Sequence, residues 1–320
     1  MSQIAPTTRL IALLALLLAV VSALWVWQGL PDNGRAFILN LRLTKLVGLI
    51  TVGAAVAVST VLFQTVAANR VLTPSIMGFD ALYMLMQTVL VIVLGTTAYV
   101  TLPASGKFLT EVGVLCALAI LLFGTLLGKG ARDIGRTILT GVILGILFRS
   151  ADSFLGQLLD PDTFATVQST QIASFNTIDA DLLPWAVGIS LAAIALAIRL
   201  GPQLDVLALG RNTAVPLGLR HSALVIGALA LVGVLVSVST ALVGPVTFFG
   251  LIVAGLTHGL AGTARHRILL PVAALIAATI LVAGQFLFER ALGLGGTLAV
   301  VIEFAGGLFF IHLLLKGRVR

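Results

Sequence analysis

Long apolar runs, separated by short polar or turn-rich segments, follow one another along almost the whole chain. The hydrocarbon core of a bilayer is about 30 Å thick, so a helix that crosses it needs about 20 apolar residues. The pattern therefore predicts ten membrane-spanning helices, of which two are short or interrupted. Their expected ranges are 10–27, 46–67, 76–100, 108–127, 137–154, 185–200, 223–242, 248–260, 268–288 and 297–315.

The composition agrees with this pattern. Of the 320 residues, 59% are hydrophobic and only 10% are charged. A soluble domain carries about 25% charged residues, so this chain cannot cover a water-facing surface and lipid must be its solvent. The 33 glycines fit the same picture, because small residues let helices approach closely in lipid. We expect an all-α, polytopic membrane protein in which residues 1–320 form a single transmembrane domain.

The charge distribution predicts the topology. The formal net charge is +7, and most basic residues lie in short segments between apolar runs. Such residues orient a protein in the membrane, so we expect lipid contacts and no nucleic-acid partner. With both termini in the cytoplasm, most of the 19 basic residues lie inside and the acidic segment 158–184 lies outside.

The first apolar run has two interpretations. Residues 21–23 (VSA) resemble a signal-peptidase site, so cleavage of this run is one alternative. Trp25 and Trp27 at its end are typical of interfacial anchors. They favour an uncleaved first helix.

Residues 201–222 form a polar, turn-rich segment between two long apolar runs. They include Asp205, Arg211 and Arg220, together with two prolines and three glycines. Our hypothesis is that this segment is a cytoplasmic elbow through which another protein pushes on a membrane-embedded pore. The chain itself would then perform no covalent chemistry and would not be an enzyme.

The sequence offers no site for a nucleotide or a metal cluster. Residues 124–130 (GTLLGKG) resemble a phosphate-binding loop, but the glycine spacing is wrong and no Ser or Thr follows Lys129. If ATP drives the protein, ATP and Mg²⁺ belong to a separate chain, and we expect no cofactor here. Cys116 is the only cysteine, which excludes an internal disulfide. The histidines lack metal-ligand spacing, and His258 and His266, which flank a basic turn, are expected to be solvated.

Four acidic residues lie in or beside the expected spans, namely Asp80, Glu111, Glu289 and Glu303. Ionisable groups inside a membrane are costly and are functional candidates. One alternative function is therefore a proton-coupled secondary transporter that uses Glu303 or Asp80. The other interpretation of these residues is a protonated or hydrogen-bonded carboxyl group at a helix interface. A structural membrane subunit that carries no solute is a further alternative.

Five stretches share motifs with one known family. They read RLTK at 42–45, QTVAANRVLTP at 64–74, RTILTGV at 136–142, LDVLALGRNTAVPLGL at 204–219 and GPVTFFGLIV at 244–253. With these motifs the chain resembles the FecCD-type permeases of ATP-binding-cassette (ABC) importers for iron siderophores and vitamin B12. The resemblance covers nearly the whole length.

The resemblance implies a type II ABC importer permease fold with ten helices, in the bacterial cytoplasmic membrane. It implies as partners a second permease, two ATPases and a substrate-binding protein. It assigns an ATPase-coupling loop to Leu204, Asp205, Leu207, Leu209, Gly210, Arg211, Ala214, Leu217 and Gly218. It assigns a cytoplasmic gate to Asn69, Val71, Asp133 and Ile134. It also assigns binding-protein docking to Arg42, Lys45 and Arg290, which from the sequence alone are equally well lipid-headgroup anchors.

Some positions depart from the family's motifs. Lys45 replaces a second arginine, Arg211 replaces an acid, and residues 254–258 (AGLTH) replace the family's P-H-x-x-R motif. Residues 77–83 and 174–177 resemble the branch that imports ferric catecholate-type siderophores. Members of that branch often pair with a different permease, so the resemblance implies a heterodimer.

Overall fold

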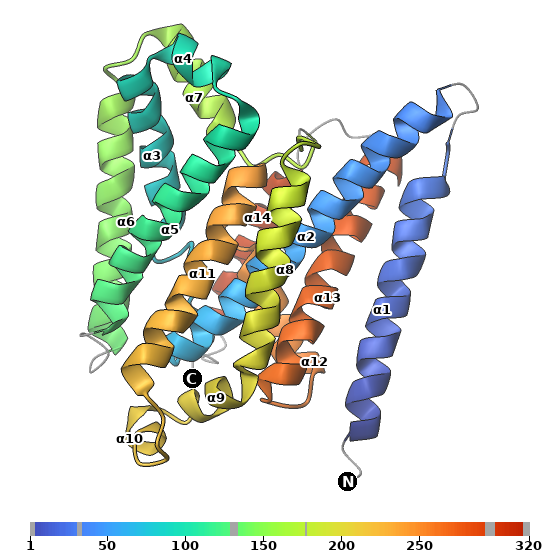
Figure 1. Cartoon of the computed structure of the whole chain (residues 1–320), viewed down its shortest axis with the longest axis vertical. Coiled ribbons are helices and arrows are strands. Elements are labelled where there is room, and N and C mark those ends of the chain that lie inside the picture. The colour runs from blue at the N-terminus through green and yellow to red at the C-terminus, as the bar shows by residue number, and fades with distance from the viewer. Residues whose placement is uncertain (1–3, 31–33, 129–133, 177, 292–297, 316–320) are drawn as a thin grey trace.

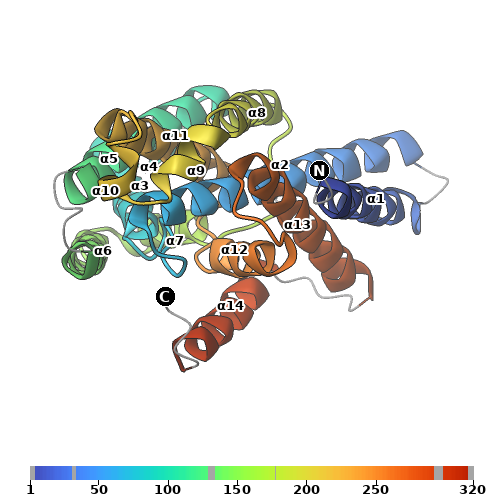
Figure 2. The same cartoon turned by 90° about the horizontal axis from the view of Figure 1, so that it is seen from below.

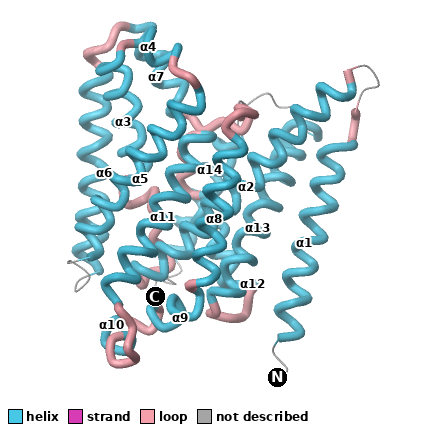
Figure 3. The backbone as a smooth tube through the Cα atoms, in the orientation of Figure 1, coloured by secondary structure: helices cyan, strands magenta, loops and turns pink. Residues whose placement is uncertain are grey.

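The computed structural model describes residues 4–30, 34–128, 134–176, 178–291 and 298–315, and this part of the chain is helical, without strands (Figures 1 and 3). The helices are α1 (Ile4–Trp27), α2 (Arg35–Ala67), α3 (Phe79–Leu94), α4 (Thr96–Thr101), α5 (Ala104–Gly128), α6 (Ile134–Gly156), α7 (Pro161–Gln171), α8 (Leu183–Arg199), α9 (Gly201–Leu207), α10 (Arg211–Ala214), α11 (His221–Val243), α12 (Phe249–Leu260), α13 (His266–Phe286) and α14 (Leu298–Leu315). A π-helical turn, Leu287–Ala291, extends α13.

Helix α2 runs through the middle of the bundle, with α8 and α11 on one side and α12 and α13 on the other (Figure 2). Small residues on α2 allow this close packing. A Cβ atom on Gly53 would lie only 3.1 Å from the backbone carbon of Ala277 and the backbone nitrogen of Ala278 in α13. The α2–α13 contact is therefore made backbone against backbone, as is common where helices pack in lipid.

The number of apolar segments agrees with the sequence expectation. Within the described residues, six helices are long and apolar enough to cross a membrane, and α8 with α9 forms one bent pair. The apolar helices α3, α12 and α14 are shorter. Together these make the ten segments that the hydropathy pattern predicts. Helix α1 packs against α13 and α2 at the edge of the bundle, and its exposed apolar side chains, such as Leu13 and Leu16, suit contact with lipid.

Two segments that the sequence pattern assigns to polar loops are helical. Helix α2 begins at Arg35, before the expected start of the second span at residue 46, because apolar residues there continue the helix. Helix α7 lies in the acidic segment and has a clear start signal. Its N-cap residue Asp160 accepts a hydrogen bond from the backbone nitrogen of Thr163 at 3.0 Å, and a proline occupies the first turn.

The expected span 76–100 is interrupted. Helix α3 ends before Gly95, which has a φ of +78° and starts the short helix α4. Such a φ suits glycine, which has no Cβ atom to clash. The span is thus divided into a shorter apolar helix and a turn of helix near α7 (Figure 1).

Candidate coupling, gating and docking sites

The expected elbow is a pair of short helices at one end of the bundle (Figure 1). Helix α9 bends away from α8 by 61°. Gly210 and Gly218, with φ values of +86° and +83°, form the turns on either side of α10. These turns let the chain leave α9 and return to α11 within a few residues.

The coupling-loop residues divide into an inner and an outer set. Leu204, Leu207 and Ala214 are buried against the bundle. Leu209 and Leu217 are 60% and 63% exposed, at the tip. Large apolar side chains exposed at the end of a bundle suit contact with another protein. The loop thus has a packed base and an apolar tip. Gly210 and Gly218 belong to the turns that connect them, and Arg211 begins α10.

The turn that follows α2 carries two of the expected gate residues. Ala68 has a φ of +48°, and the Asn69 side-chain oxygen accepts a hydrogen bond from the backbone nitrogen of Val71 at 2.9 Å. Gln64 donates to the backbone oxygen of Arg70 at 2.5 Å and closes the turn. A cavity of about 560 Å³ opens beside it, lined in part by Asn69, Arg70 and His258.

The second half of the expected gate is only partly described. Asp133 lies outside the described residues. Ile134 begins α6, and only its backbone is described. The pairing of these residues with Asn69 and Val71 therefore stays a prediction.

The three expected docking cations converge on one tryptophan at the end of the bundle opposite the elbow. Trp25 is 1% exposed, and its indole nitrogen donates to the backbone oxygen of Arg42 at 3.1 Å. The Lys45 ammonium group lies 5.7 Å from the Trp25 ring centre, and the Arg290 guanidinium lies 6.0 Å from it. These distances are in the range of cation–π interactions. Nothing in the local sequence of Trp25 indicates this central position.

The three cations differ in what they offer to a partner. Arg42 is 6% exposed and donates to the backbone oxygens of Val26, Gln28 and Gly29 at 2.6, 3.0 and 2.8 Å. It therefore caps the carboxyl end of α1, where backbone oxygens lack helical partners. Lys45 is paired with the carboxylate of Glu289. Arg290 is the exposed member of the group.

Asp80 connects the start of α3 to the break between α11 and α12. It lies at the start of α3, is 5% exposed, and accepts a hydrogen bond from the Thr247 hydroxyl at 2.8 Å. Thr247 belongs to the break between α11 and α12. Asp80 thus fits a hydrogen-bonded carboxyl group at a helix interface, while Glu303 lies on an exposed face of α14.

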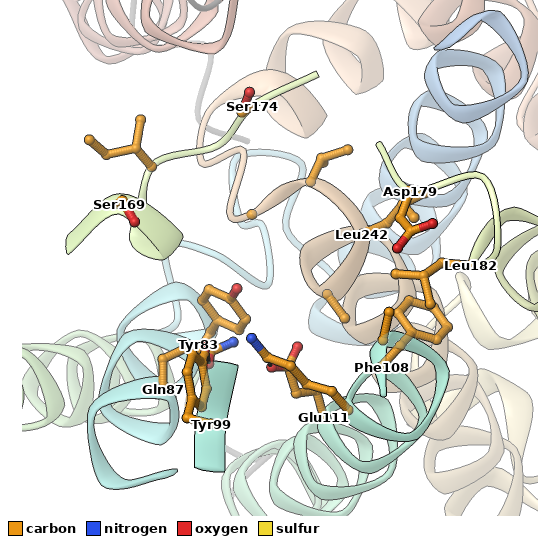
Figure 4. Close-up of a pocket in the computed structure, with 16 residues that line it drawn as sticks. Tyr83, Gln87, Tyr99, Phe108, Glu111, Ser169, Ser174, Asp179, Leu182 and Leu242 are labelled. Carbon is orange, nitrogen blue, oxygen red and sulfur yellow. Dashed lines mark hydrogen bonds and ion pairs between the residues drawn. The ribbon is translucent and has the colours of Figure 1, made fainter. Parts of the chain in front are cut away.

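A second polar cluster lines a cavity of about 640 Å³ between α3, α5 and the end of α11 (Figure 4). The Tyr99 hydroxyl donates to Gln87 at 2.8 Å, and the Lys107 ammonium lies 3.6 Å from the Tyr99 ring centre. Lys107 also lies 4.0 Å from the carboxylate of Glu111, which is 4% exposed. The sequence analysis identified only Glu111 of this cluster. Gln87, Tyr99 and Lys107 lie on three different helices, so no local pattern indicates that they meet.

A bundle of apolar helices with a helical elbow at one end and a cation cluster at the other fits a membrane permease. The chain belongs to the FecCD transport family, whose sequence model matches residues 8–316. The family match confirms the expected family, the all-α permease fold and the expectation of a transport subunit rather than an enzyme.

Curated relatives match along most of the length of the chain. The petrobactin import system permease protein YclO of Bacillus subtilis (strain 168) is 39% identical over 306 residues, which cover 96% of each chain. The petrobactin import system permease protein FatC of Bacillus anthracis is 33% identical, covering 97% of this chain and 88% of FatC. The Fe(3+) dicitrate transport system permease protein FecD of Escherichia coli (strain K12) is 28% identical over 86% of this chain and 85% of FecD.

A solved structure has the same fold. It is described as a metal-chelate type ABC transporter in an inward-facing conformation, and its TM-score against this chain is 0.80. The alignment covers 97% of this chain and 99% of the other at 23% identity. At that identity the likeness establishes the fold.

Proposed function

We propose that this chain is one permease subunit of an ABC importer that carries a ferric siderophore across the bacterial cytoplasmic membrane. The full-length similarity to two permeases named for petrobactin import carries this proposal. It makes a petrobactin-type siderophore the first substrate to test. A partner chain binds ATP and Mg²⁺ and hydrolyses the nucleotide.

The two ends of the bundle have different tasks in this scheme. The elbow, whose apolar tip carries Leu209 and Leu217, sits in a cleft of an ATPase on the cytoplasmic side. Helix α1 begins at the same end as the elbow (Figure 1), in keeping with a cytoplasmic amino terminus. The opposite end, with Arg290 at its surface, receives the substrate-binding protein on the outer side.

The second permease is a different homologue, which makes a heterodimer with two ATPases below it. Exposed apolar side chains on α6 and α14 support a protein or lipid neighbour against these two helices. They include Leu139, Ile143, Ile146, Leu147, Val300, Phe304 and Leu308. A pathway between two such faces is largely apolar, as suits a bulky solute that must be released as readily as it is taken up.

Transport then follows from coupled movements. Charge pairs between the binding protein and the outer end set the register of docking. Binding of ATP closes the two ATPases and displaces the elbow. The helices rock against each other at their small-residue contacts, and the pathway opens alternately to either side.

Reconstitution tests this function. The complete transporter is placed in lipid vesicles with ATP inside, and uptake of radioactive iron bound to petrobactin is measured with the binding protein outside. We expect uptake that requires ATP, is unaffected by a protonophore, and is accompanied by binding-protein-stimulated ATP hydrolysis. Uptake without the ATPase that a protonophore abolishes would show a proton-coupled transporter instead. Absence of stimulated hydrolysis and of uptake would indicate a structural subunit.

A further inference from the structure

Asp205 in the elbow helix α9 makes a double contact with the first residue of α13. One oxygen of its carboxylate accepts a hydrogen bond from the backbone nitrogen of His266 at 2.8 Å. The same oxygen lies 2.7 Å from the Nδ1 atom of the His266 ring. Asp205 therefore acts as an N-terminal cap for α13 that comes from another helix, where a negative charge also interacts favourably with the helix dipole.

His266 extends this contact to a third helix. The residue is 3% exposed, contrary to the solvated histidine that the basic turn predicts. Its Nε2 atom lies 2.7 Å from the hydroxyl of Thr65, in the last turn of α2. The Thr65 hydroxyl also lies 2.8 Å from the backbone oxygen of Val61. The tautomer of the His266 ring determines which of these two partners receives the hydroxyl proton. The side chains of Asp205, His266 and Thr65 thus connect α9, α13 and α2.

The end of α2 that receives this connection leads directly into the expected gate. Thr65 lies one turn before Asn69, and both line the same cavity beside the turn after α2. Leu204 and Leu207 of α9 are buried against the bundle by apolar packing. Apolar packing has no direction, whereas hydrogen bonds to a charged group fix both distance and orientation.

Helix α9 also approaches the start of α13 closely at a second point. A Cβ atom on Gly201 would lie 3.1 Å from the backbone nitrogen of Arg267. Gly201 and Asp205 are one helical turn apart and therefore lie on the same face of α9. Both ends of that face meet the first turn of α13, so α9 cannot move away from α13 without breaking the Asp205 contact.

We propose that Asp205 and His266 are positioning residues that transmit the displacement of the elbow to the gate at the end of α2. This inference rests on the proposed function as an ATP-driven importer. In it, Asp205 pulls on the start of α13, and His266 passes the movement to Thr65. The chain Asp205–His266–Thr65 determines how much solute moves for each ATP that the partner hydrolyses.

The test measures the ratio of siderophore taken up to ATP hydrolysed, in vesicles that contain the complete transporter. Replacing Asp205→Ala removes the acceptor for both hydrogen bonds, and we expect the ratio to fall on the order of tenfold. Asp205→Asn keeps an oxygen that can accept from the His266 backbone, so its ratio should lie between those of Asp205→Ala and the wild type. Co-purification of the ATPase is measured in parallel, so that lost assembly is not mistaken for lost coupling.

A milder pair of variants keeps the proposal testable if Asp205→Ala does not assemble. Thr65→Val removes only the hydroxyl group, and we expect a ratio lowered about threefold. Thr279→Val is the matched control, because the hydroxyls of Thr65 and Thr279 both donate to the backbone oxygen four residues earlier, at 2.8 and 2.7 Å, while that of Thr65 also contacts His266. It should leave the ratio unchanged. In the double variant with Asp205→Asn, Thr65→Val should add little, since both act through His266.

The outcomes separate the two proposals. If the wild-type transporter shows no ATP-driven uptake, the proposed function itself is wrong. If the wild type transports but Asp205→Asn and Thr65→Val retain its ratio of uptake to ATP, the transmission through His266 is wrong and the function stands. Equal losses for Thr65→Val and Thr279→Val would mean a general effect of helix stability and would also overturn the inference.

Discussion

Lys45 forms an ion pair with Glu289, which lies 244 residues further along the chain. The pair joins α2 to the π-helical turn that ends α13, next to Trp25 of α1. Glu289 also accepts a hydrogen bond from Gln285 at 2.6 Å. A carboxylate held in this way neutralises Lys45 and leaves Arg290 as the exposed charge of the cluster.

Arg290→Glu should weaken the docking of the binding protein. The substitution reverses the exposed charge, and like charges across an interface slow association and raise the dissociation constant, here by about tenfold at low salt. The measurement is binding of the purified binding protein to the transporter in nanodiscs at two salt concentrations. Arg35→Glu is the control, because Arg35, at the start of α2, is another exposed cation. Equal affinities for the wild type and Arg290→Glu would reject the docking assignment.

Arg42→Ala should destabilise the fold rather than only weaken docking. The Arg42 guanidinium donates to three backbone oxygens at the end of α1, and leaving such groups unpaired costs about 2–4 kcal/mol in total. We expect a clearly lower midpoint of thermal unfolding in detergent. Arg35→Ala, at an exposed position on the same helix, should shift the free energy of unfolding by less than about 0.5 kcal/mol. Matching midpoints for the two variants would contradict the capping role.

Gly53→Ala should destabilise the central helix contact. The new Cβ atom would meet the backbone of Ala277 and Ala278 at 3.1 Å, and backbone atoms cannot turn aside as a side chain can. Overpacking of this kind costs about 1–3 kcal/mol. Gly188→Ala on α8 is the matched control, because no atom lies within 4 Å of its added Cβ. The measurement is the midpoint of thermal unfolding of both variants in the same detergent. A Gly53→Ala variant with the midpoint of the wild type would contradict the close packing of α2 against α13.

The apolar runs were sufficient to place most helices, because in lipid a helix must satisfy its own backbone and its length follows from the bilayer. They could not reveal α7, whose start depends on the cap made by Asp160, nor the continuation of α2 back to Arg35. His266 was expected in solvent because it sits beside a basic turn. Its partners Asp205 and Thr65 are 61 and 201 residues away, so no local pattern could indicate its burial.

Asp80 and Glu303 give the last test, since a proton-coupled transporter would depend on one of them. Asp80→Asn keeps an oxygen that can accept from the Thr247 hydroxyl, so in an ATP-driven importer uptake should stay within about twofold of the wild type, as the structural role of the hydrogen bond predicts. Glu303→Gln, on the exposed face of α14, should behave in the same way. A proton relay cannot work through an amide, because an amide does not titrate. Uptake that either variant abolishes, while the transporter still assembles and hydrolyses ATP, would show that the carboxyl group itself takes part in transport.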